Sequence, residues 1–197
     1  MNRWIAGILC GALWPAALAA PAGPEELAAA IRERLGRPGV VRGEFEQRKH
    51  IQALTRPLVS RGDFVVARER GVLWRTRAPF GQTVRLTREG IVLEQEGETT
   101  ARLSAEREPA VRAAIGLLFA LWAGDFDRLR EYFQVTGRAG QEVWSATLTP
   151  AGALAAQLFR SVRMEGDRHI RAVDLVERNG DRTEIRFSRL RSDEALT

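Results

Sequence analysis

The sequence predicts a mainly β domain of the α+β class, in which antiparallel meanders of about eleven strands are interrupted by helices. Three observations lead to this prediction. Most segments alternate apolar and polar residues with a period of two, which is typical of half-buried strands. Turn residues such as Asn179-Gly180 separate these segments at short intervals. One segment, residues 109–123, is instead almost uniformly apolar, yet it is too short to span a bilayer.

The composition fits one globular domain. The chain has 197 residues, 45% hydrophobic and 28% charged, which excludes a disordered chain or a polytopic membrane protein. A single cysteine excludes an internal disulfide, and with only two histidines we expect no metal site and no cofactor. The arginines are mixed with acidic residues, so we expect a solvated mixed surface and no nucleic-acid partner. A weak attraction to anionic lipid head groups is the alternative reason for the basic balance.

Residues 1–19 have the pattern of an export signal. A positive charge precedes an uncharged apolar stretch that ends in the small-residue cleavage pattern Ala17-Leu18-Ala19. We expect cleavage after Ala19, with residues 20–22 as a later alternative, and a single domain over residues 20–197. An uncleaved anchor helix is the rival interpretation, which Pro15 weakens. Export of this kind predicts a protein of the periplasm of a Gram-negative cell.

The first half of the domain begins with a helix and continues as strands. Residues 24–35 place Leu27, Ala28, Ile31 and Leu35 on one helical stripe, and a Gly-Arg-Pro-Gly sequence ends it. From residue 41 the period changes to two. Strands are expected at residues 41–48, 58–67, 72–76, 83–87, 91–95 and 99–103.

The second half begins with helices. Residues 109–123 are predicted to form a helix that is apolar nearly all round, so that water cannot be its neighbour on any face. Residues 125–133 are expected to continue as an amphipathic helix, and residues 150–159 to form a short helix that begins at a proline. Further strands are expected at residues 132–136, 142–149, 161–165, 170–177 and 183–188, with turns at residues 137–140 and 179–180.

No catalytic set is evident in the sequence. Nucleophile-elbow, phosphate-loop and dinucleotide-binding glycine motifs are all absent. His50 and His169 stand in polar strand-end and turn segments, where an exposed residue is the simpler interpretation than a catalytic base. The carboxylate pairs Glu25-Glu26 and Asp125/Asp127 stand at helix starts, where capping explains them. We therefore expect a protein that is not an enzyme.

The aromatic and aliphatic residues have two explanations. One is a plain core. The other is a cavity, favoured because residues 114–123 are apolar on both sides, as suits a helix with a sheet on one side and an apolar ligand or partner on the other. The candidate cavity residues are Phe45, Phe64, Val66, Trp74, Leu86, Ile91, Leu93, Ile115, Leu118, Phe119, Trp122, Trp144, Leu154 and Leu158.

Short motifs run in order along nearly the whole mature chain. They are Phe45-x-Gln47-x-Lys49, Gly62-Asp63-Phe64, Trp74, Pro79, Tyr132-Phe133-x-x-x-Gly137, Leu148-Thr149-Pro150 and Gly180-Asp181-x-Thr183-x-Ile185-x-Phe187. Their order and spacing resemble the LolA family of periplasmic lipoprotein carriers. The resemblance implies an incomplete antiparallel β-barrel with helices that form a lid, residues 109–123 among them, over a hollow that holds acyl chains.

The resemblance also implies a lock on the lid. The family uses an arginine, in an Arg-Pro-x-x-x-x-Trp stretch, to hydrogen-bond the lid backbone when the hollow is empty. Counting back from Trp74, that arginine is Arg68, followed here by Glu69 where the family has proline. Arg70 is a second candidate, and a surface pair between Arg68 and Glu69 is the other explanation.

The implied function is a carrier that shields the acyl chains of a lipoprotein or lipid during transport towards the outer membrane. The expected partners are this acylated cargo, an inner-membrane exporter and an outer-membrane acceptor, with the carrier itself a monomer. General carriers continue beyond the last strand, whereas this chain stops at Thr197, so a dedicated lipid or lipid-linked product is an alternative cargo. Two other functions stay open: an envelope lipid-binding sensor or scaffold, and a hydrolase or transferase acting on an envelope lipid.

Overall fold

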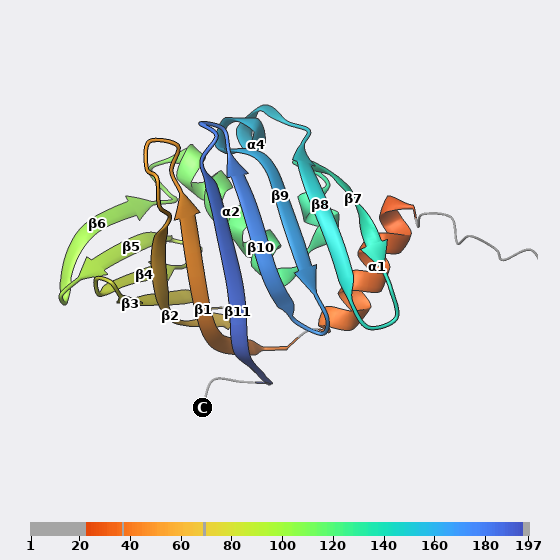
Figure 1. The fold of residues 1–197 in the computed structure, drawn as a ribbon, viewed down its shortest axis with the longest axis horizontal. Coiled ribbons are helices and arrows are strands. Elements are labelled where there is room, and N and C mark those ends of the chain that lie inside the picture. The colour runs from red at the N-terminus through yellow and green to blue at the C-terminus, as the bar shows by residue number, and fades with distance from the viewer. Residues whose placement is uncertain (1–22, 37, 69, 195–197) are drawn as a thin grey trace, which may run out of the picture.

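A computed structural model describes residues 23–36, 38–68 and 70–194, so the predicted export signal lies outside the described residues. The described residues form eleven strands in one antiparallel sheet, in the order β6-β5-β4-β3-β2-β1-β11-β10-β9-β8-β7 (Figure 1). The sheet is not closed, because β6 and β7 are its two free edges. The predicted fold class, mainly β with an incomplete barrel and inserted helices, is confirmed.

The elements follow closely the order that the sequence predicts. The helices are α1 (Pro24–Leu35), α2 (Pro109–Ala123), α3 (Phe126–Leu129) and α4 (Ala153–Leu158). The strands are β1 (Val40–His50), β2 (Leu58–Ala67), β3 (Gly71–Ala78), β4 (Gln82–Leu86), β5 (Gly90–Gln95), β6 (Glu98–Ser104), β7 (Phe133–Ala139), β8 (Trp144–Pro150), β9 (Phe159–Gly166), β10 (Ile170–Glu177) and β11 (Arg182–Asp193).

The helix α2 lies in the connection between the two edges of the sheet. Strands β1 to β6 form one meander and β7 to β11 a second, and the two meet where β1 pairs with β11. The chain must therefore pass from the edge strand β6 to the opposite edge strand β7, and α2 and α3 make this connection. Both α1 and α2 lie on the same side of the sheet, behind it in Figure 1.

Several predicted boundaries are wrong. The last strand, predicted at residues 183–188, continues to Asp193, and in three other cases strand pairing takes residues assigned elsewhere. The amphipathic helix does not extend over residues 125–133 but ends at Leu129, because Phe133 pairs with Pro150 in the first register position of β7 and β8. The same pairing shortens the last helix, predicted at residues 150–159. The turn predicted at residues 137–140 lies further on, where the Gly140 amide donates to the Val143 carbonyl at 2.9 Å.

The pairing of β1 with its neighbours places aromatic rings over glycines. Phe45 stands opposite Gly62, and Gly43 opposite Phe64. A Cβ atom on Gly62 would lie 2.9 Å from the Phe45 ring, and one on Gly43 would lie 3.2 Å from the Phe64 ring. Because these glycines lack side chains, both rings can lie close to the sheet. Trp74 stacks on Phe45 with the ring centroids 3.7 Å apart. Strands β1 to β3 therefore carry a layer of aromatic rings that lies close to the sheet.

The hydrophobic interior consists of three separate clusters of buried residues. The α1 cluster joins α1, α3 and the end of α2 to β7, β8 and β9, with Leu27, Ile31, Phe126, Trp144 and Leu148 among its members. The α2 cluster consists of Val72, Leu86, Ala105 and Ile115, with Leu118 and Phe119 packed against it. The aromatic cluster consists of Phe45, Phe64 and Phe187, with Trp74 packed against it.

The helix α2 is apolar on both sides because it packs against two of these clusters. Leu117 and Leu121 are buried in the α1 cluster, whereas Ile115 belongs to the α2 cluster. The predicted all-round apolarity thus has a structural cause in the position of the helix. Within the described part of the chain, no helix combines the length and apolarity that a membrane crossing requires.

The other face of the sheet is solvated and carries paired charges. Arg61 of β2 contacts Glu46 of β1 at 2.8 Å, and Asp63 forms ion pairs with both Arg75 and Arg77 of β3, at 2.8 and 2.7 Å. Such exposed pairs are each worth about 0–1 kcal/mol. They match the mixed surface that the composition predicts.

Candidate functional site

A cavity of about 480 Å³ lies between α2 and the inner face of the sheet, where the three hydrophobic clusters meet. This volume falls within the range of about 300–1,000 Å³ typical of ligand sites. The lining residues are Leu35, Gly36, Pro38, Val41, Phe64, Val66, Arg68, Arg88, Arg112, Ile115, Gly116, Phe119, Ala120, Ala123, Asp125, Arg128, Arg168, His169, Ile170, Phe187 and Leu190.

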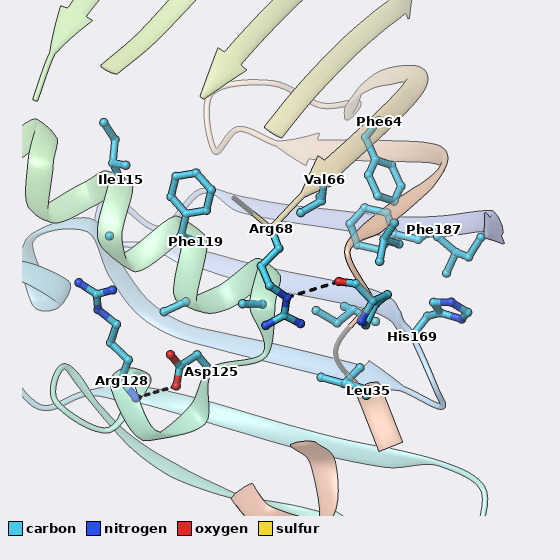
Figure 2. A pocket seen from close by; sticks show the side chains of 18 of the residues that line it. Leu35, Phe64, Val66, Arg68, Ile115, Phe119, Asp125, Arg128, His169 and Phe187 are labelled. Atoms are coloured by element: carbon cyan, nitrogen blue, oxygen red, sulfur yellow. Dashed lines mark hydrogen bonds between the residues drawn. The ribbon is translucent and has the colours of Figure 1, made fainter. Parts of the chain in front are cut away.

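The sheet side of the cavity is built by β2 and β11. Phe64 and Phe187 meet edge to face with their centroids 5.2 Å apart, and both line the cavity (Figure 2). Val66 follows on the same face of β2, because alternate residues of a strand share a face. Cross-strand packing thus gives this wall a continuous apolar surface.

The helix side is built by α2, and it contains a position without a side chain. Ile115 and Phe119 lie one helical turn apart and line the cavity. Between them, Gly116 leaves open space, since the nearest atom to a Cβ built there is Nη2 of Arg128 at 3.6 Å. The helix therefore borders the cavity without filling it.

The loop between α1 and β1 closes one end of the cavity. Leu35, at the end of α1, lines the cavity and packs against α2. The Leu35 side chain fills the space that a Cβ atom on Gly124 would need. Gly124 follows α2, and its φ of 58° lets the chain turn sharply there. Arg68 lies beside this loop, and its Nε donates to the Pro38 carbonyl at 3.4 Å. Its backbone amide donates to Gly39 at 2.9 Å.

His169 is the one histidine that lines the cavity. Its backbone amide donates to the Asp167 carboxylate at 2.8 Å, and its Nε2 lies 2.8 Å from the Ser192 hydroxyl. Burial, together with the positive charges of Arg171 and Arg168, lowers the pKa of the His169 imidazole, although Asp167 opposes this. The Nδ1 atom is buried and has no hydrogen-bond partner among the described residues, so no carboxylate orients this ring as a triad requires.

The predicted cavity residues divide into three groups. Phe64, Val66, Ile115 and Phe119 line the cavity, as does the predicted lock Arg68. Phe45, Trp74, Leu86, Ile91 and Leu118 lie in the clusters around it, and Leu93 is half-buried on β5. Trp144 is buried in the α1 cluster, Leu158 is 40% exposed, and the side chains of Trp122 and Leu154 lie outside the described part.

Most of the charged lining was not predicted. Arg88, Arg112, Arg128 and Arg168 come from segments far apart in the sequence and carry no shared pattern. Phe187 and Val41 could have been found, since strand alternation places both on the inner face. Of the arginines that line the cavity, the sequence predicted only Arg68, from its spacing to Trp74.

Several solved structures are similar to this chain. A LolA superfamily protein from Nitrosomonas europaea has 9% identity, with 87% of this chain and 95% of that chain covered and a TM-score of 0.47. A putative outer membrane lipoprotein-sorting protein domain from Vibrio parahaemolyticus has 12% identity, with 89% and 95% covered and a TM-score of 0.45. Lipoprotein LppX from Mycobacterium tuberculosis has 11% identity, with 89% and 99% covered and a TM-score of 0.43.

No curated protein matches the sequence. A family model, however, matches residues 19–193, which is nearly the whole chain. This match confirms the resemblance that the dispersed motifs indicate. The chain therefore belongs to the family described as outer membrane lipoprotein carrier protein LolA-like.

Proposed function

We propose that this protein is a periplasmic carrier that shields the acyl chains of a lipoprotein or lipid on the way to the outer membrane. The observation that carries this proposal is the cavity between α2 and the sheet, with its apolar walls from β2, β11 and α2. A protein of this kind acts by binding, without chemistry on its cargo. It works as a monomer between an exporter in the inner membrane and an acceptor in the outer membrane.

The energetics of transfer explain why such a cavity is needed. Burying one methylene group stabilises an acyl chain by about 0.8 kcal/mol, so a long chain does not leave a membrane for water unaided. A cavity of about 480 Å³ is equivalent to roughly sixteen volumes the size of a water molecule, about 30 Å³ each, and a methylene group is of similar size. The cavity thus has room for one long acyl chain.

Mass spectrometry of lipid bound to the protein isolated from the periplasm tests the proposal. Wild type should retain acylated cargo in a fixed ratio, and Phe119→Glu, which brings a charge to the cavity wall, should lose it. Phe80→Glu is the matched control, because Phe80 is 75% exposed and outside the cavity lining. Wild-type protein without acylated material would contradict the carrier role, and turnover of the lipid would favour the hydrolase or transferase instead.

The lock role of Arg68 is a finer part of the proposal. Its guanidinium lines the cavity together with α2 and donates to the loop that follows α1, at Pro38. Arginine suits such a role because its five donors are held in a fixed fork. We expect Arg68→Leu to accept cargo but to release it poorly to an acceptor. Transfer at the wild-type rate in a donor–acceptor vesicle assay would assign the lock elsewhere, with Arg70 as the next candidate.

A further inference from the structure

The lining of the cavity is strongly basic. It contains five arginines, Arg68, Arg88, Arg112, Arg128 and Arg168, and one carboxylate, Asp125. Five positive charges less one negative charge leave +4, with His169 neutral. The arginines come from five different segments, so the fold itself gathers them around one apolar space.

None of these arginines forms an ion pair with another described residue. Among the described residues, the Arg112 guanidinium donates only to backbone carbonyls, to Ala105 at 2.9 Å and to Glu106 at 3.3 Å. On the outer face of the sheet, by contrast, arginines contact carboxylates, as Arg75 and Arg77 contact Asp63. The five arginines of the cavity are exposed residues that no described carboxylate pairs with, so their donors are open to a ligand.

Arg128 shows most clearly where this charge lies. Its Nη2 is 3.6 Å from the position of a Cβ on Gly116, so the guanidinium reaches the bare part of the α2 wall (Figure 2). The Asp125 side chain forms no ion pair with this guanidinium; its Oδ1 accepts the Arg128 backbone amide at 3.2 Å as the cap of α3. Arg128 is itself exposed, so its guanidinium donors lie between the apolar wall and solvent, where they can bind a phosphate or carboxylate group.

We propose that the cargo is an anionic amphiphile, with its acyl chain in the cavity and a phosphate or carboxylate group at the arginines. This inference rests on the proposed function, because it takes the acyl chain as the occupant of the cavity. The acyl chain provides most of the affinity, and the arginines select the head group and fix the orientation in which the lipid is held. Lipids with uncharged heads leave the arginines without a partner and are held less tightly.

Calorimetric titration of the mature protein with single-chain probes tests this selection. Dodecyl phosphate, dodecyl phosphocholine and dodecyl maltoside share one chain, and each is used below its micelle concentration, with inorganic phosphate as the fourth probe. We expect dodecyl phosphate to bind about tenfold or more tightly than dodecyl maltoside, the size of effect of one charge-assisted hydrogen bond. The preference should shrink as salt is raised from about 0.05 to about 0.5 M.

Paired variants assign the preference to the cavity. The double variant Arg128→Gln, Arg168→Gln should bring the affinity ratio of dodecyl phosphate to dodecyl maltoside close to one. Arg138→Gln should keep the wild-type ratio, because Arg138 is exposed on β7, outside the cavity, and likewise lacks an ion pair among the described residues. A ratio kept in the double variant would overturn the assignment to these arginines.

The remaining outcomes separate the head-group inference from the carrier role. Equal affinity for the three dodecyl probes would overturn the inference and leave the carrier role intact. Inorganic phosphate that binds as tightly as dodecyl phosphate would also overturn it, by showing an anion site independent of the chain. Failure of all three dodecyl probes to bind would contradict the carrier role itself.

Discussion

The two halves of the sheet differ in how their inner faces are covered. Over β7 to β9, α1 and α3 pack directly on the sheet, and large side chains such as Trp144 and Phe126 are 2% and 0% exposed. Over β1, β2 and β11, by contrast, the cavity lies between α2 and the sheet, and Leu118 and Phe119 of α2 are only partly buried. One half of the molecule supplies a close-packed core, and the other keeps a space that a ligand can fill.

The difference teaches how one domain can be stable and hollow. An unfilled volume in a core costs stability in proportion to its size, so a cavity must be offset by dense packing elsewhere. Here the dense packing lies in the α1 cluster, outside the cavity lining apart from Ala120 and the flanking Leu35 and Ile170. Binding and release of cargo can then change the α2 half while the α1 half stays folded.

The largest expected effect is on the close-packed half. Trp144→Ala removes a ring that meets Phe126 edge to face, and it leaves the Asp167 carbonyl without the 2.7 Å hydrogen bond from the indole. We expect the free energy of unfolding to fall by about 3–5 kcal/mol, as for other buried Trp and Phe truncations. Urea denaturation followed by circular dichroism measures it. A loss below about 1 kcal/mol would remove the distinction between the halves.

A smaller effect on stability is expected from the matched truncation in the hollow half. Phe119→Ala removes a partly buried ring beside existing space, so the free energy of unfolding should fall by about 1 kcal/mol. Acyl binding should weaken more than stability does, because the ring forms part of the wall. Denaturation and titration with dodecyl maltoside on the same protein preparation measure both. A stability loss equal to that of Trp144→Ala would mean that the α2 half is as solidly packed.

The smallest expected effect is on pH dependence. Because the pKa of His169 is lowered in the folded protein, protonation favours the unfolded chain. The neutral His169 imidazole therefore contributes its full share of stability above the ordinary histidine pKa of about 6.5, and this share is lost as the pH falls below that value. Denaturation curves at pH 7.5 and about 5 should therefore show a smaller stability loss for His169→Asn than for wild type. An identical loss in both proteins would place the pH sensitivity elsewhere.

Local periodicity was sufficient for most of the fold. The bounds of β2, α2 and β10 agree with the predicted ones, because each carries an uninterrupted pattern between clear turn signals. Periodicity failed around Phe133, where an apolar residue after a helix fits either a last helical turn or a first strand position. Pairing with Pro150 on β8 decided between them, and such pairing is not visible in the local pattern.

The site was predicted less completely than the fold. The apolar walls followed from strand alternation and from the uniform apolarity of α2, which is why Phe64 and Phe119 were found. The basic lining did not, because Arg88 and Arg168 stand in turns that meet at the cavity only through the long-range order of the sheet. A single sequence does not show which of many scattered arginines come together.

The central claim is that space for an acyl chain exists beneath α2, and Gly116→Phe tests it most directly. The new ring would enter the open volume beside Gly116, where the nearest atom is the flexible end of Arg128. The account predicts an unfolding free energy equal to or up to about 0.5 kcal/mol above that of wild type, since Gly is a poor helix former, together with loss of dodecyl maltoside binding. A stability loss above about 2 kcal/mol, as overpacking produces, or unchanged binding would contradict it.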